Sequence, residues 1–450
     1  MKNSISLLLR FATSFSLLVG AILYAEDEIR VELATRTPLT PVYLCGFSEG
    51  GSALSPGYAE QLKKVLQFDL RTCGFVSIAP TDDEVEKALS SADPKTAFSS
   101  PLNAGAPYVI KAVVEQKQIN LYVFTVKNGN LKQFPAIALS GDLNQDRRQI
   151  HKLSDGIVSS LFNSKGVAGT RVLYSVQLNP LDSSPGKWRS EIWECDYDGA
   201  SVRQVTQEEN FSITPVMIPG SDRYVYVSYK TGQPKIYLSS VKQRTGRRIV
   251  DIRGNQILPA VSQQRDKIAF ICDASGRADL FVQKIDQNGE LIDKPVQLFS
   301  YPNSTQGSPT FSPDGAKIAF VSDKDGAARI YLIPSSFVGK RPQPQLITKI
   351  NRENTCPSWS PDGTKLAYSA KTNGIRQIWI YDFATGEERQ LTAGPGNKEN
   401  PVWGPNSLHL IFNSTDPSSS ELYLVNLNQP EAVKITQGPG KKHYPTWGTR

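Results

Sequence analysis

The chain has 450 residues, of which 39% are apolar and 21% are charged, so it can bury a sizeable core and is not a disordered polymer. Its net charge of +7 comes from 50 basic and 43 acidic residues that are well mixed, which does not indicate a nucleic-acid-binding protein. No run of about 18 apolar residues occurs beyond the N-terminus, which excludes a multispanning membrane protein.

The first 25 residues are typical of a secretory signal peptide. A basic start at Lys2 precedes an apolar run that Arg10 interrupts, so the longest unbroken stretch covers residues 11–25. That stretch is short for a membrane span and suits the apolar region of a signal peptide. We therefore expect export and cleavage after Ala25, with an uncleaved membrane anchor as the alternative.

Residues 26–165 predict a small α/β domain, because helical and strand patterns alternate there. One predicted helix begins with a capping box formed by Thr81 and Glu84. The predicted helices cover 56–67, 81–90 and 147–162, and the predicted strands cover 29–33, 42–45, 108–114 and 121–126. Residues 166–170 are the predicted linker to the second half of the chain.

The cysteines and histidines give no metal-binding motif. Cys45 and Cys73 fall in the same N-terminal segment and could form a disulfide after export. The other cysteines, Cys195, Cys272 and Cys356, lie in strand-like runs and are predicted to be small buried apolar side chains. None of the three histidines is spaced with a second ligand, so we predict no structural metal and no cofactor.

A repeat governs the chain from about residue 170 onward. Its clearest copies are SPTFSPDGAKIAFVSD from Ser308, CPSWSPDGTKLAYSA from Cys356 and NPVWGPNSLHLIFNS from Asn400. The anchor prolines, which recur every 44–50 residues, are Pro215, Pro259, Pro309, Pro357, Pro401 and Pro445. Each unit reads as four short strands, and a four-strand unit of about 45 residues is typical of a propeller blade.

The order of these strands predicts a closed ring. Six second strands begin near Val172, Tyr224, Lys267, Lys317, Lys365 and His409. Six first strands begin at the anchor prolines, so the two series are offset by one. The opening blade therefore lacks its own first strand, and the chain ends on a spare one at 444–448. We expect the spare strand to pair with 172–176 and to close a six-bladed β-propeller over residues 170–450, rather than a non-circular stack of sheets.

Acidic residues in the repeat are predicted to serve turns. Asp314 and Asp362, with the glycines that follow them, belong to Ser-Pro-Asp-Gly sequences that favour type I turns. The Asp-Lys-Asp-Gly sequence at 323–326 resembles a calcium loop, but it lacks the remaining oxygen ligands and the distal Glu. We interpret it as a hairpin turn.

Several strings together resemble the TolB family, the periplasmic propeller component of the Tol–Pal system of Gram-negative bacteria. They are HKLSDGIVSSLF followed by GVAGTRVLYSV, then CDYDGASVRQVT, then the FSPDGAKIAFVS repeats. The resemblance covers nearly the whole mature chain. It implies a monomeric, non-enzymatic periplasmic scaffold that maintains outer-membrane integrity and supports its constriction during cell division.

The resemblance also implies two partner-binding regions. An extended N-terminal arm would bind TolA and switch between a free and a docked state, which lets one partner influence the other. The arm residues are Glu26, Asp27, Glu28, Ile29, Arg30, Val31, Glu32 and Leu33. Their alternation of apolar and polar residues suits addition of a strand to a partner's sheet. Other Tol-complex or envelope proteins are further expected partners.

The second region would bind the peptidoglycan-associated lipoprotein Pal. First strands are innermost in a propeller, so residues just before the anchor prolines should ring the channel mouth. The candidates are Thr214, Asn255, Gln256, Leu258, Gly307, Ser308, Thr355, Asn400, His443 and Tyr444. Asn255 and Gly307 align with family positions that are tied to Pal binding. Ordinary solvated loops are the alternative interpretation.

Two other functions compete with a scaffold. Gly46–Gly50 matches the Gly-x-Ser-x-Gly motif of serine hydrolases, with Ser48 as nucleophile and His151 as the histidine of that region. The short domain and the gap before the next helix oppose this function, so we expect Ser48 to lie in a mobile loop. A carbohydrate-binding propeller could use its tryptophans to stack sugars. Most of Trp188, Trp193, Trp359, Trp379, Trp403 and Trp447 fall at matched strand positions, which favours packing instead.

Overall fold

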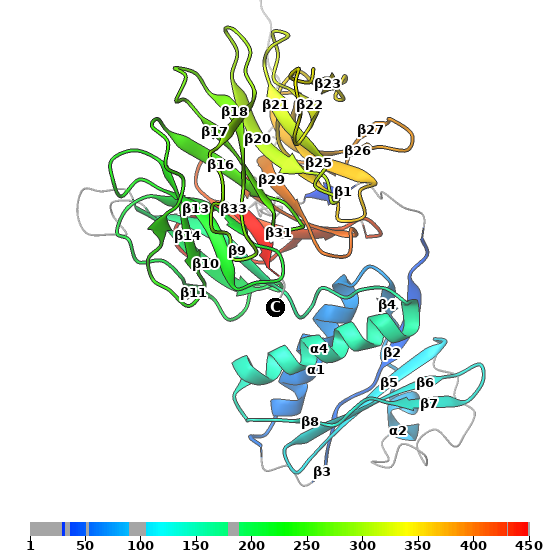
Figure 1. Cartoon of the computed structure of the whole chain (residues 1–450). Helices are drawn as coiled ribbons and strands as arrows, with labels where there is room; N and C mark the ends of the chain where they lie inside the picture. Colours follow the sequence, from blue (N-terminus) through cyan, green and yellow to red (C-terminus); the bar gives the residue numbers. More distant parts are fainter. Residues whose placement is uncertain are drawn as a thin grey trace, which may run out of the picture.

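The computed structural model describes residues 29–31, 37–50, 54–89, 105–178, 189–429 and 431–448. The predicted signal peptide and the arm residues Glu26–Glu28, Glu32 and Leu33 lie outside the described residues. The chain forms an α/β domain and a propeller, and helices α1 and α4 of the α/β domain lie between its sheet and the propeller (Figure 1). None of the described helices combines the length and the apolar character that crossing a membrane requires.

The α/β domain is built on one sheet with the strand order β4-β2-β5-β6-β7, to which β3 and β8 add at β5 and β6. Strand β2 pairs in parallel with β4 and β5, whereas β5 and β6 form an antiparallel hairpin. The elements are β2 Thr40–Leu44, β3 Ser48–Gly50, α1 Tyr58–Thr72, β4 Val76–Ile78, α2 Asp83–Ala88, β5 Tyr108–Glu115, β6 Gln118–Thr125, β7 Asn130–Gln133, β8 Ile137–Ala138 and α4 Leu143–Phe162.

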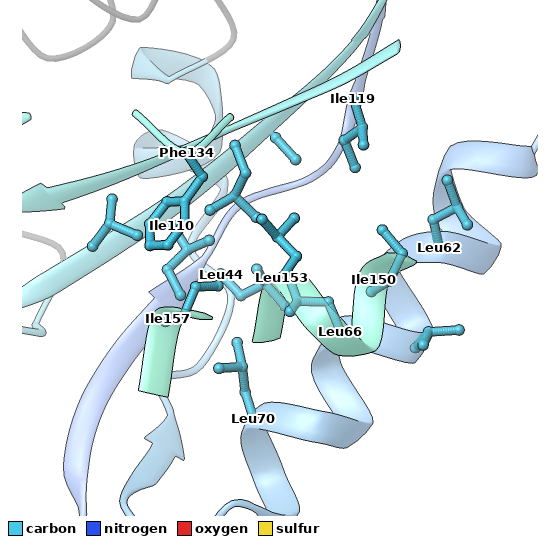
Figure 2. Close-up of a cluster of buried hydrophobic side chains, with 14 of the residues drawn as sticks. Leu44, Leu62, Leu66, Leu70, Ile110, Ile119, Phe134, Ile150, Leu153 and Ile157 are labelled. Atoms are coloured by element: carbon cyan, nitrogen blue, oxygen red, sulfur yellow. The ribbon is translucent and has the colours of Figure 1, made fainter. Parts of the chain in front are cut away.

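The core of this domain lies between the sheet and the two long helices, and Figure 2 shows its side chains pointing toward one another. Helix α1 contributes Leu62, Leu66 and Leu70, and α4 contributes Ile150 and Ile157, all of them fully buried. Their spacings of four and seven residues place them on one face of each helix. This apolar face fixes how α1 and α4 are oriented, and therefore which of their residues face the propeller.

The boundaries of all three predicted helices differ in the structure. Helix α4 begins at Leu143 rather than at residue 147, because Asp142 is its N-cap. Helix α1 ends at Thr72 rather than near residue 67, because Leu70 continues its apolar face. The predicted capping box at Thr81 is wrong. Asp82 is the N-cap of α2, and its carboxylate accepts hydrogen bonds from the backbone N–H groups of Glu84 and Val85 at 2.9 and 3.1 Å. Aspartate is a better N-cap than threonine, so the capping-box spacing of Thr81 and Glu84 outweighed the stronger local preference at Asp82 in the prediction.

The propeller has six four-stranded blades, which confirms the predicted architecture. The first two blades contain β9 Arg171–Leu178, β10 Arg189–Asp196, β11 Arg203–Gln204, β12 Ser212–Met217, β13 Arg223–Ser228, β14 Lys235–Ser240 and β15 Arg247–Arg248. The next two contain β16 Gln256–Val261, β17 Lys267–Cys272, β18 Asp279–Lys284, β19 Val296–Phe299, β20 Gln306–Phe311, β21 Lys317–Ser322, β22 Arg329–Pro334 and β23 Gln345–Leu346. The last two contain β24 Asn354–Trp359, β25 Lys365–Thr372, β26 Ile375–Asp382, β27 Glu388–Gln390, β29 Asn397–Trp403, β30 His409–Thr415, β31 Ser420–Asn426 and β32 Val433–Lys434.

The C-terminal strand β33, Lys441–Gly448, closes the ring. It pairs antiparallel with β9 and supplies the innermost strand of the first blade, with Trp447 opposite Val172. The predicted spare strand is thus the missing strand of the opening blade. Closure removes the open sheet edge that β9 would otherwise present.

Every innermost strand contains the same irregularity just before its anchor proline. The six residues there have left-handed backbones, with φ between 43° and 54°, and the strand register shifts beside each of them. They are Thr214, Leu258, Ser308, Cys356, Asn400 and Tyr444. Such a bulge bends a strand and re-aims its side chain. As a result, all six residues line one cavity along the propeller axis.

The acidic turn residues are placed as predicted. Asp362 accepts hydrogen bonds from the backbone N–H of Thr364 at 3.0 Å and from the Ser360 hydroxyl at 2.6 Å. Asp314 does the same in the preceding blade, and the backbone of Asp323 closes a turn with Gly326. These aspartates fix local turns, and the calcium-loop resemblance at 323–326 reflects a hairpin turn.

All five cysteines are free, so the possible Cys45–Cys73 disulfide is not formed. Successive residues of a strand point to opposite faces. Leu44 faces the helices, so Cys45 faces the opposite side of the sheet with Tyr43, whereas Cys73 follows α1 on the helix side. Cys356 is also only partly buried, because it lines the axial cavity rather than a blade core.

Candidate functional site

The N-terminal arm is docked on the propeller. Strand β1, Arg30–Val31, pairs antiparallel with β28, Thr392–Ala393, which lies in the connection between the fifth and sixth blades. Ile29 is only 7% exposed and packs in a core cluster with Leu391 and Phe412. Figure 1 shows β1 lying against the propeller before the chain runs to the α/β domain. The arm therefore adds a strand to this chain's own fold.

The predicted mouth residues lie within the first four residues of the innermost strands, with Asn255 directly before β16. Thr214, Leu258, Ser308, Asn400 and Tyr444 line the axial cavity, which has a volume of about 280 Å³. Asn400, His443 and Tyr444 also line a second cavity of about 580 Å³ at the end of the axis where these strands begin. We call this end of the propeller, where the innermost strands begin, the far mouth.

Three of the predicted residues form hydrogen bonds with other residues of the propeller. Gln256 is fully buried, and its amide donates to the carbonyls of Val250 and Ile252, so its side chain does not reach the far mouth. Asn255 is held by Asp273 through its backbone N–H and its side-chain amide. Thr355 accepts a hydrogen bond from an Arg376 guanidinium nitrogen at 3.3 Å. Gly307 and Ser308 occupy the matching bulge of β20.

The far mouth includes residues that the sequence argument did not name. Phe211 and Tyr229 line it, with their rings edge-to-face at a centroid distance of 6.2 Å. Glu399 also lines it, and burial raises the pKa of its carboxyl although Arg376 opposes that shift. Cys356 completes the axial ring, with its Sγ 3.1 Å from Asn400 Oδ1. The position of Cys356 directly before an anchor proline indicated that it lines the axis. Its strand-like neighbours led instead to the prediction that its side chain is buried in a blade.

His443 gives the far mouth an uncharged imidazole. Burial, and to a smaller extent the nearby Lys441 charge, lower the pKa of His443 to about 4. The His443 and Tyr444 rings lie 6.0 Å apart. At neutral pH the mouth is therefore aromatic and weakly charged on this side.

The opposite end of the propeller carries the α/β domain. The C-terminal carbonyls of α1 accept hydrogen bonds from propeller side chains, as the unpaired carbonyls of a helix end require. Thr72 O accepts from His409 Nε2 at 2.7 Å and from Asn426 Nδ2 at 3.1 Å. Arg71 O accepts from Gln429 at 2.6 Å and Gly74 O from Asn428 at 2.8 Å. These contacts define the near face of the propeller.

A buried polar cluster crosses the same seam. His151 Nδ1 on α4 lies 2.9 Å from an Asp69 carboxylate oxygen on α1, and the Tyr197 hydroxyl donates to that carboxylate at 2.7 Å. Asp198 pairs with Arg147 and lies 3.5 Å from His151 Nε2. Burial alone would lower the pKa of His151, but the Asp69 and Asp198 carboxylates raise it above its ordinary value.

The hydrolase arrangement is not formed. Ser48 begins strand β3, paired with β5, and its hydroxyl lies 3.5 Å from the Ala112 carbonyl. A nucleophile elbow instead places its serine on a sharp turn directly before a helix. The expected mobile loop at Ser48 is also wrong, because the strand pairs there. His151 is engaged by Asp69 rather than by a serine.

The described tryptophans pack within and between blades. Trp359 stacks on Phe383 at a centroid distance of 4.6 Å. Trp403 is 4% exposed and donates its indole N–H to the Ser358 carbonyl of the neighbouring blade. Trp447 donates to the Thr170 hydroxyl at the start of the propeller. These contacts favour packing over sugar binding, and Trp188 lies outside the described residues.

Comparisons with known proteins agree with this architecture. The family model described as the TolB beta propeller domain matches residues 158–450. A Protein TolB homolog of Protochlamydia amoebophila is 46% identical over 386 residues, which cover 83% of this chain and 82% of that protein. The Chlamydia caviae homolog is 36% identical over 398 residues, which cover 87% of each chain.

The crystal structure of TolB from Acinetobacter baumannii superposes with a TM-score of 0.74 at 19% identity, and the match covers 94% of this chain and all of that one. At this identity the structural match supports the shared fold alone. The family model and the sequence relatives go further, because they match most of the chain at substantial identity. The chain belongs to the TolB family, the propeller component of the Tol–Pal system.

Proposed function

We propose that this protein is an exported, periplasmic docking protein that binds Pal at the far mouth and TolA through its N-terminal arm. It catalyses no reaction in this role. The observation that carries the proposal is the separation of the two ends of the propeller. The α/β domain covers the near face and forms hydrogen bonds with its side chains. The aromatic far mouth lies at the other end of the propeller and faces away from that domain.

Strand direction supports this separation. The innermost strand of the sixth blade, β29, begins at Asn397, and the turn after it carries Asn406, which donates to the Lys165 carbonyl at the near face. A strand of this length spans about 20 Å, so its two ends lie on opposite faces. Asn400 is the central residue of β29, three residues from the end at the far mouth, and the same polarity holds for the other five innermost strands.

The far mouth has the character of a protein-docking surface. Its core is aromatic, from Phe211, Tyr229 and Tyr444, with few charges. Aromatic anchors in a rigid pocket contribute a large share of binding energy at protein interfaces. Exposed apolar side chains follow on the connections at the same end, namely Tyr301, Ile350 and Ile375 at 43%, 59% and 37% exposure. A Pal surface that covers these residues would bury them.

The arm supports a two-state role. Its pairing with β28 involves a short strand, beside which the Ile29 side chain is buried. Burying an isoleucine side chain contributes about 2 kcal/mol, which a competing partner strand can replace. TolA would bind the arm when it leaves β28, and the connection that holds β28 leads directly into β29 of the far mouth. Pal and arm docking would thus influence each other, and this coupling would serve outer-membrane integrity and constriction during division.

Binding measurements test the proposal. Titration calorimetry with the periplasmic domain of Pal should show a loss of affinity of at least about 30-fold for Tyr444→Ala, the scale of a hot-spot residue. Val338→Ala, a fully exposed side chain in the connection between β22 and β23, is the matched control and should bind as the wild type does. Removal of residues 26–35 should abolish TolA binding and leave the propeller folded. Equal Pal affinity of the Tyr444 variant and the wild type would refute the assigned surface.

A further inference from the structure

Three potential metal ligands meet at the seam between the α/β domain and the propeller. His151 comes from α4, and Asp196 and Asp198 come from the end of β10 and the turn that follows it. One ligand atom of each residue lies within 4.8 Å of those of the other two. His151 is 1% exposed and Asp196 is 2% exposed, so the cluster is closed to bulk water.

Two atoms in this cluster are buried without a hydrogen-bond partner. They are His151 Nε2 and Asp196 Oδ2. The nearest carboxylate oxygen to His151 Nε2 is Asp198 Oδ2 at 3.5 Å, beyond the distance of a good hydrogen bond for this pair. Buried polar atoms are nearly always satisfied, so two unpartnered atoms in one cluster of potential ligands point to a missing partner.

The Asp69 carboxylate fixes the orientation of the His151 imidazole through the ring nitrogen that faces away from the cluster. Both oxygens of Asp69 lie 2.9–3.0 Å from His151 Nδ1, and Tyr197 and the seam bury that carboxylate. A carboxylate on one ring nitrogen holds the proton there and leaves the lone pair of the other nitrogen free. This is the arrangement by which a second-shell carboxylate orients a histidine that binds a metal.

The charges leave room for a divalent cation. Asp69, Asp155, Asp196, Asp198 and Glu194 are the acidic groups of the region, and Arg147, Arg171 and Arg203 are its bases. With a neutral imidazole the acids exceed the bases by two charges. Arg171 binds Asp196 through Oδ1 at 2.8 Å, which leaves Oδ2 for another partner. Such bonds to the outer oxygens of ligating carboxylates are common around metal ions.

We propose that His151, Asp196 and Asp198 bind a divalent transition-metal ion, with Zn²⁺ as the best match to one imidazole and two carboxylates. A water molecule would complete the coordination. Because the histidine belongs to the α/β domain and the aspartates belong to the propeller, the ion would clamp the two bodies together. A proton on His151 is the competing occupant, and the experiment separates the two.

The first test is a Zn²⁺ titration of the full mature chain with any affinity tag removed. We expect one saturable site per chain and a rise in thermal midpoint with Zn²⁺, since the ion binds the folded form. His151→Gln should weaken binding at least 100-fold, and Asp69→Asn about 10- to 100-fold, the range measured for outer-shell partners. His443→Gln, at the far mouth, is the matched control and should keep the site.

The second test needs no variant and decides the matter if His151→Gln fails to fold. Wild-type crystals soaked in ZnCl₂ should show anomalous density at the zinc edge about 2.0–2.1 Å from His151 Nε2. Density at other places only, or no saturable binding, would show that a proton occupies the site and would overturn the proposal. Binding that survives in His151→Gln would overturn it as well.

Discussion

The two ends of the propeller are built from the same strands but are used differently. At the near face, His409, Asn426 and Gln429 give their hydrogen-bond donors to the end of α1, and the buried cluster around His151 completes the seam. At the far mouth, Phe211 and Tyr444 line an open cavity. In a repeat protein the strands set the scaffold, and the turns at each end decide what it holds.

Loss of ring closure should have the largest effect, because it removes the scaffold that both ends share. Deleting residues 441–450 removes β33, including Trp447, and exposes the edge of β9. We expect destabilisation by more than about 5 kcal/mol, comparable with the whole stability of a typical domain. Thermal unfolding followed by circular dichroism would show a lost or broadened transition. A chain shortened by only residues 449–450 is the control and should unfold as the wild type does.

Replacing His409 should remove a hydrogen bond that joins the near face to helix α1. This side chain is 1% exposed and donates to the Thr72 carbonyl, so His409→Ala leaves a buried carbonyl with one bond fewer and a small cavity. We expect a loss of about 2–3 kcal/mol in unfolding free energy, measured by urea denaturation. His443→Ala at the far mouth should cost less than about 1 kcal/mol. Equal losses for the two variants would contradict the difference between the ends.

Acid should weaken the same contact. Burial lowers the pKa of His409 to about 4, with the bond to Thr72 opposing the shift, whereas an unfolded histidine titrates near 6.5. The unfolded chain therefore binds more protons, so stability falls as the pH drops from about 6.5 to about 4 and is constant above that window. The contribution is about 3 kcal/mol at most. Urea titrations of the wild type and His409→Gln should converge as the pH falls, and parallel curves would argue against it.

The docking of the arm can be weakened without unfolding the ring. Ile29→Ala removes most of the buried side chain that holds β1 on β28 and should cost about 2 kcal/mol of docking free energy. Hydrogen exchange of residues 29–31 should speed up about 30-fold, while the blades exchange as before. Ile375→Ala, an exposed side chain in the fifth blade, is the matched control. Unchanged exchange in Ile29→Ala would mean that other contacts hold the arm.

The smallest effect is expected at a turn. Asp362 accepts bonds from Ser360 and Thr364 at the near-face end of the fifth blade. Asp362→Ala should lower stability by about 1 kcal/mol and leave Pal and TolA affinity unchanged, because the turn touches neither proposed partner surface. Calorimetry with both partners checks this, and a change in Pal affinity would place the docking surface on the wrong end.

The propeller was predictable because each blade repeats a strong pattern. The start positions of the second strands, from Lys267 to His409, agree with the structure, since an alternating strand between Gly-rich turns has one plausible register. Closure by the C-terminal strand followed from counting the strands, although this strand begins at Lys441 rather than at the predicted residue 444. The α/β domain was less predictable. Its helix boundaries shifted where packing in the core overrode the local signals, as at Leu70 and Asp82.

The functional groups were predictable only where the repeat itself placed them. The residue before each anchor proline could be assigned to the axis, which found Thr214 and Tyr444. The partners of β1 and of His151 could not be found, because pairing with Thr392–Ala393 and contact with Asp198 join segments that are far apart in sequence. Gln256 was misplaced, because its sequence neighbours Asn255 and Ile257 are half-buried at the axis while its own amide bonds inward to Val250 and Ile252.

Hydrogen exchange with and without the Pal periplasmic domain tests the central claim most directly, since it reads both ends of the propeller in one experiment. The account predicts slower exchange at the far mouth, in residues 211–214, 255–258, 398–400 and 442–444. Exchange in the near-face turns around Asn406 and Gln429 should not change. Protection of the near-face turns with an unprotected far mouth would contradict the account.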